Sequence, residues 1–164
     1  MERFYTDENP SHFPIELSCI RIIKAKVSLN TAIHLFEFNQ DNNAVCNRCY
    51  YAVFYAINAV HALDTNSFSS HKMALGEFNK NYIAKDEVFS RSYGRQIYEL
   101  QSRRHVSDYD DYAVIPRDEL AGHIEFAKDI LKDIEAYCRR RVGEEIWQKL
   151  YGGIARTYLE ESSE

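Results

Sequence analysis

Residues 46–58 of this 164-residue chain read CNRCYYAVFYAIN, and this stretch decides the fold. Apolar side chains occupy nearly every side of the helix that it predicts, which is typical of a buried helix. We therefore expect a central helix over about residues 44–63, with the other elements packed around it.

One side of this predicted helix is polar. At helical spacing it carries Asn47, Arg48, Tyr51, Tyr55 and Asn58. Polar side chains on a buried helix must find hydrogen-bond partners, or they line a cleft or a subunit seam. Two interpretations follow: a structural face with internal hydrogen bonds or a dimer interface, and a ligand-binding face formed by Asn47, Arg48, Tyr51 and Tyr55.

Helical periodicity continues on both sides of this stretch. Apolar residues at three- and four-residue steps predict five further helices. They run over residues 15–36, from Ser69 or Ser70 past Tyr82, over 88–108, from Pro116 to 142, and over 144–159. We expect the last of them to be interrupted at Gly152-Gly153. No segment alternates like a strand. The sequence therefore predicts an all-α, up-and-down bundle of five to six helices.

Turn and irregular segments divide the chain into three expected parts. Residues 1–14 form an irregular N-terminal arm, residues 15–142 form the helical bundle, and residues 143–164 form a C-terminal helical extension.

Composition excludes several function classes. The formal net charge is −5, so no overall positive field attracts nucleic acid and any such site must be local. No signal peptide or long apolar run is visible, so we expect a cytoplasmic protein without a membrane span. Cys46 and Cys49 lie inside the central helix without a second pair, which favours core packing; we expect no metal and no cofactor.

The fourth predicted helix carries an arginine on its apolar stripe. Tyr93, Ile97 and Leu100 lead at helical steps to Arg104, and Asp108 follows one turn later. An inward guanidinium needs a carboxylate partner, and Asp108 is placed to provide it. The pair is either a structural pin for the helix end or an arginine held ready for a phosphate.

Three segments in this order resemble small stand-alone HEPN proteins (higher eukaryotes and prokaryotes nucleotide-binding). The first is residues 48–56, RCYYAVFYA; the second is the Ser-His segment up to Phe78; the third is the Arg…Asp-Tyr ending of residues 104–109. The resemblance covers about residues 25–140.

The resemblance implies a helical bundle that usually dimerises, with paired sites near the two-fold axis. It also implies a toxin–antitoxin or defence setting, with a minimal nucleotidyltransferase as the antitoxin partner. In nuclease members an arginine and a histidine a few positions later meet in the dimer and cleave RNA without a metal. Arg104 matches the arginine, whereas Tyr109, Asp110 and Asp111 occupy the window of the histidine.

We therefore expect a homodimer that binds or acts on RNA or a nucleotide. As a metal-independent ribonuclease it would use Arg104 for the phosphate and Asp108 to orient Arg104, with Tyr109 or His71 for proton transfer. Tyr109 also corresponds to a tyrosine that the partner enzyme nucleotidylates in some relatives. The alternative function is a non-catalytic nucleotide- or protein-binding helical module.

Overall fold

The computed structural model describes residues 9–161, and every regular element in that range is a helix. A 3-10 turn (Pro10–His12) leads into α1 (Phe13–Glu37) and α2 (Asn42–Leu63). They are followed by α3 (His71–Phe78), the π-helical segment η2 (Asn79–Lys85), α4 (Ser92–Tyr109), α5 (Arg117–Val142) and α6 (Glu144–Glu161). The predicted all-α bundle is confirmed.

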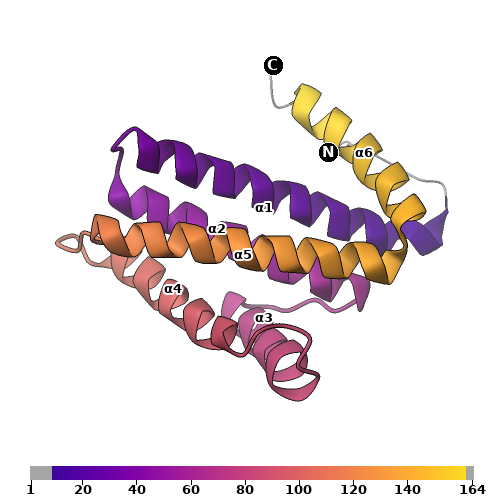
Figure 1. Cartoon of the computed structure of the whole chain (residues 1–164), viewed down its shortest axis with the longest axis horizontal. Coiled ribbons are helices and arrows are strands. Elements are labelled where there is room, and N and C mark those ends of the chain that lie inside the picture. The colour runs from indigo at the N-terminus through magenta and orange to yellow at the C-terminus, as the bar shows by residue number, and fades with distance from the viewer. Residues whose placement is uncertain (1–8, 162–164) are drawn as a thin grey trace.

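The long helices α1, α2 and α5 lie side by side, with α3 and α4 on one side of them and α6 on the other (Figure 1). Because α2 packs against α1, α3, α4 and α5, it is the centre of the core, as its composition predicts. Val45, Cys46, Cys49 and Ala52 on this helix have no exposed surface.

Three side chains at the start of α2 cap the helix or bind the α4–α5 loop. Asp41 caps the helix by accepting a hydrogen bond from the backbone N–H of Asn43 at 2.9 Å, so α2 begins two residues earlier than predicted. The Asn42 amide donates to the carbonyl of Ile115 at 2.9 Å, and the Asn43 amide donates to the carbonyl of Ala113 at 2.8 Å. These bonds tie the α4–α5 loop to α2.

Several helix boundaries differ from the predicted ones. The first helix begins at Phe13 rather than Ile15, and residues 1–8 of the expected arm lie outside the described residues. Ser70 caps α3, and the chain then continues as the π-helical η2, which periodicity did not indicate. Helix α4 begins at Ser92 rather than Val88, because the N–H groups of Val88 and Phe89 donate back to the carbonyl of Tyr82.

Helix α6 is continuous through Gly152-Gly153, so the predicted interruption is wrong. A glycine in a helix interior costs only about 1 kcal/mol relative to alanine. Trp147, Leu150 and Ile154 are buried where α6 packs on α1 and α5, and burial of large apolar side chains outweighs that cost.

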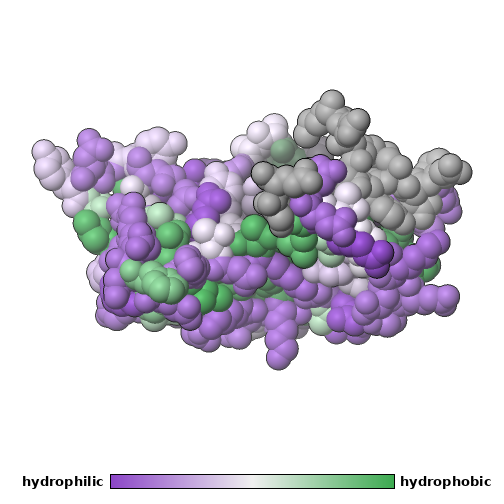
Figure 2. All heavy atoms as spheres, turned by 90° about the horizontal axis from the view of Figure 1, so that it is seen from above, coloured by the Kyte–Doolittle hydropathy of each residue, from purple (hydrophilic) through white to green (hydrophobic). Residues whose placement is uncertain are grey.

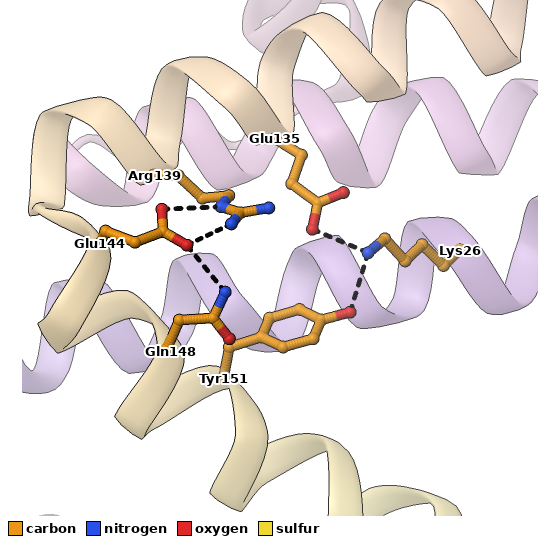
Figure 3. Close-up of polar contacts among 6 residues, drawn as sticks. All are labelled: Lys26, Glu135, Arg139, Glu144, Gln148 and Tyr151. Carbon is orange, nitrogen blue, oxygen red and sulfur yellow. Dashed lines mark hydrogen bonds and ion pairs between the residues drawn. The ribbon is translucent and has the colours of Figure 1, made fainter.

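Polar contacts from three helices hold α6 against the bundle (Figure 3). Lys26 of α1 lies 2.7 Å from Glu135 of α5, and its ammonium donates to the hydroxyl of Tyr151 at 3.1 Å. Arg139 pairs with Glu144 at the start of α6, and Gln148 donates to the same carboxylate at 2.8 Å.

The face formed around α1 and α6 is mostly hydrophilic, with hydrophobic side chains in smaller patches (Figure 2). None of the helices within residues 9–161 combines the length and apolar character of a membrane span.

A buried histidine makes the stability of the bundle depend on pH. His61 is buried, and its Nε2 donates to the carbonyl of Ala74 at 2.9 Å, while Nδ1 has no partner within the described residues. Burial lowers its pKa below the ordinary 6.5. The unfolded chain therefore binds more protons, so stability is complete above the unfolded pKa and falls as pH drops below it.

We predict that the free energy of unfolding decreases between about pH 7.5 and pH 5, and that His61→Phe makes this slope shallower. Chemical denaturation at both pH values measures the effect. An unchanged slope in the variant would contradict the assignment, whatever its absolute stability.

Candidate functional site

Arg104 lies on α4 against the polar side of α2. Its guanidinium carbon is 5.2 Å from the centre of the Tyr50 ring and 5.7 Å from that of Tyr51, so both rings make cation–π contacts with it. Its Nε lies 2.8 Å from Oδ2 of Asp108, and both side chains are about three-quarters buried. The predicted Arg104–Asp108 ion pair is confirmed.

A second arginine belongs to the same network. Arg48 donates to Oδ1 of Asn47 from Nη2 at 2.6 Å, and the Asn47 amide reaches Oδ1 of Asp108 at 3.5 Å. The Arg48 guanidinium lies 5.1 Å from the centre of the Tyr51 ring. Tyr51 therefore contacts two guanidinium groups, and Asp108 is the carboxylate that the network places between them. The pair of arginines keeps an excess positive charge.

His71, at the start of α3, completes this group of side chains. We call the group the Arg104 cluster; its members are Asn47, Arg48, Tyr50, Tyr51, His71, Arg104 and Asp108. Its Nδ1 is 3.0 Å from the hydroxyl of Tyr50, and its ring packs on Phe54 with centres 3.9 Å apart. Burial and, to a smaller extent, the charge of Arg104 lower the pKa of His71. Burial raises the pKa of Tyr50 to about 12, so its hydroxyl keeps its proton. At neutral pH the site thus holds a neutral imidazole beside a guanidinium.

The other predicted residues have different positions. Tyr55 lies one turn along α2, with the Lys24 ammonium 5.6 Å from its ring centre. The Asn58 amide donates to the carbonyl of Phe54 within its own helix. Tyr109 is 72% exposed and its ring contacts His105, 4.7 Å away, so the structure does not place it beside the Tyr50 and Tyr51 rings. Of the two residues expected to transfer a proton, only His71 lies at the cluster.

Three residues of this network, Asn47, Arg48 and Asp108, line a hollow between α1, α2 and the end of α4. This hollow has a volume of about 550 Å³, and its lining includes Asn47, Arg48, Ser107 and Asp108. A smaller hollow of about 220 Å³ shares Arg48 with it, and a third of about 540 Å³ shares Lys24 and Tyr55 with the second. The three hollows follow one another along α1 and α2 through these shared residues, and we call this row of hollows the α1–α2 groove.

Sequence reasoning missed Tyr50, which contacts both Arg104 and His71. Tyr50 is 2% exposed, and its ring belongs to the core rather than to the polar stripe. No spacing rule signals a hydroxyl that reaches a histidine on another helix. Arg21 and Lys24 of α1, which line the groove, were also missed.

Cys46 and Cys49 are buried free thiols in the core. Burial raises the pKa of each to about 12, which disfavours the thiolate form that binds a metal. Within residues 9–161, no three His, Cys, Asp or Glu side chains are grouped as metal ligands.

Comparison with known proteins identifies the family to which this fold belongs. The HEPN domain family model matches residues 20–137, which include α2, α3, α4 and most of α5. A UPF0332 protein of Thermotoga maritima is 28% identical over 112 residues, which cover 68% of this chain and 83% of that protein. The whole of α6 lies beyond the family match.

The proximity of His71 to Arg104 gives a direct test of the site. We predict that His71 titrates below 6.5 in an NMR titration, and that Arg104→Gln raises its pKa because the neighbouring positive charge is lost. Arg103→Gln is the matched control, because Arg103 pairs with Glu119 on α5 instead. Equal effects of the two variants would show that Arg104 does not act on His71 locally.

Proposed function

Because the chain belongs to the HEPN family, we propose that its Arg104 cluster binds the phosphate backbone of RNA and that a homodimer of the chain cleaves RNA there without a metal ion. One observation carries the proposal: a guanidinium and a neutral histidine from different helices meet at the same pair of tyrosine rings. This pairing provides a phosphate ligand and a proton acceptor without the α4 histidine of nuclease members.

The chemistry follows from these two groups. His71 takes the proton of a ribose 2′-hydroxyl, whose oxygen attacks the neighbouring phosphorus. The 5′-oxygen leaves and takes a proton from solvent, and His71 releases its proton to solvent. The products are a 2′,3′-cyclic phosphate and a 5′-hydroxyl. Arg104 stabilises the negative charge that develops on the phosphoryl oxygens, and Asp108 orients Arg104.

Arg104→Lys tests this role, because lysine keeps the charge but loses the planar fork that binds a phosphate in two places. We predict a folded variant whose RNA cleavage or RNA affinity falls by about 1–3 kcal/mol, the scale of a charge-assisted hydrogen bond. Cleavage of single-stranded RNA in EDTA is the measurement, with Arg103→Lys as the matched control. Unchanged activity in a well-folded Arg104→Lys protein would remove Arg104 from the site.

The same assay separates the ribonuclease from the second candidate, a non-catalytic nucleotide- or protein-binding module. That candidate is favoured by the position of His105, which turns to Tyr109 rather than to the cluster. RNA that binds in an Arg104-dependent way but stays intact, in both the native protein and His71→Gln, supports the binding module. Loss of cleavage in His71→Gln, with binding retained, supports the enzyme.

The homodimer is supported by the half-buried aromatic side chains of α2, and HEPN domains commonly dimerise. Tyr51, Phe54 and Tyr55 are only partly covered although they lie on the central helix. A second copy that packs along the edge of this stripe, and leaves the hollows beside it open, would bring two Arg104 clusters together. A toxin–antitoxin or defence setting, with a minimal nucleotidyltransferase as partner, fits such a dimer.

We predict a dimer in sedimentation equilibrium at micromolar concentration. Tyr55→Arg weakens it, because the substitution places a further positive charge beside Lys24 at the proposed seam. Tyr98→Arg on α4, where the side chain is 70% exposed, is the control and leaves the dimer intact. A monomer at every concentration would exclude the paired-site mechanism.

A further inference from the structure

The far end of the α1–α2 groove contains a second group of positive charges. This end pocket, of about 540 Å³, lies between α1, α2 and the start of α3. Its lining includes Arg21, Lys24, Ser69 and Ser70, and none of the described residues that line it carries a carboxylate. In a chain with a net charge of −5, such a pocket is a local positive site.

Within the described part of the chain, the cations of this end pocket have no counterion. Arg21 donates from Nη1 to the backbone carbonyl of Asn58 at 2.6 Å and is partly buried. Lys24 lies over the Tyr55 ring. Within residues 9–161 neither side chain forms an ion pair, whereas Lys26, two residues further along α1, pairs with Glu135. Two neighbouring, partly covered positive charges without a carboxylate favour a bound anion.

Aromatic side chains line the same pocket. Phe54, Tyr55 and Phe68 line it together with His71, so aromatic surface for a flat ring lies next to the positive charges. A base stacked on aromatic rings with its phosphate on Arg or Lys side chains is the usual chemistry of nucleotide recognition. The volume suits one nucleotide, since small-ligand pockets measure about 300–1,000 Å³.

We propose that this end pocket binds a terminal phosphate group together with its adjoining base, with Arg21 and Lys24 as the phosphate ligands. A terminal phosphate carries up to two negative charges and matches two cations, whereas a phosphate within an RNA strand carries one. The ligand is the phosphorylated end of an RNA or a free mononucleotide. The RNA form rests on the proposed function, but the phosphate site does not.

The pocket adjoins the Arg104 cluster through His71, which lines the pocket and contacts Tyr50. An RNA end held by Arg21 and Lys24 would therefore set the distance from the strand end to the cleaved bond. Phosphorylated ends would be bound in preference to hydroxyl ends.

Binding measurements test the phosphate site alone. The probes are the four nucleoside 5′-monophosphates and 3′-monophosphates, with the four nucleosides as references, titrated by calorimetry. We expect at least one monophosphate to bind about tenfold more tightly than its nucleoside, the effect of one charge-assisted hydrogen bond. Lys24→Gln and Arg21→Lys should each reduce this preference, whereas Lys132→Gln, an exposed change on α5 of equal charge, should not.

A second arm uses single-stranded RNA of one sequence with a 5′-phosphate, a 3′-phosphate or neither. A preference for one phosphorylated end that disappears in Lys24→Gln identifies RNA ends as the ligand; a preference seen only with monophosphates identifies free nucleotides. Equal binding of monophosphates and nucleosides, or an unchanged preference in folded Lys24→Gln and Arg21→Lys proteins, would overturn the proposal. Arg104→Lys should keep the preference even if it abolishes cleavage, so the two proposals fail independently.

Discussion

Burial of α2 at the centre of the bundle is the constraint from which the site follows. A helix that packs against four others has few positions left for polar side chains, so those positions fall on one stripe. Tyr51 and Arg48 occupy that stripe because burying either polar group on an apolar side of the helix, without a hydrogen-bond partner, would cost free energy of desolvation. The groove is therefore where the core leaves the central helix uncovered.

The α4 side of the site depends on the loop bonds at the start of α2. Asn42 and Asn43 hold the carbonyls of Ile115 and Ala113, which brings the end of α4 beside the first turns of α2. Arg104 can then reach the tyrosine rings while Asp108 meets Asn47. Hydrogen bonds between α2 and the α4–α5 loop thus help to set the position of the guanidinium.

The two ends of the groove differ in how their positive charge is compensated. Near Arg104 the charge is shared with Asp108, which fixes the orientation of the guanidinium and lowers its net field. Near Arg21 and Lys24, no carboxylate among residues 9–161 lines the pocket. An arginine held in a fixed orientation by a carboxylate is suited to stabilise negative charge that develops on a phosphate during a reaction. Cations without a carboxylate partner are suited to bind a phosphate group in its ground state. This difference is consistent with separate tasks for the two ends.

The amino-acid sequence by itself determined the helical class, the buried central helix, its polar stripe and the Arg104–Asp108 pair, because these depend on spacings within one helix. The broken α6 was a wrong prediction, since packing of Trp147 and its neighbours outweighs the local cost of two glycines. Tyr109 was expected to act with Arg104 because both match the Arg…Asp-Tyr ending of HEPN proteins, yet Tyr109 is exposed beside His105. Only the tertiary structure decided that Tyr50 and His71 meet, and that Arg21 and Lys24 share a pocket with the start of α3, because contacts between helices depend on how the whole core packs.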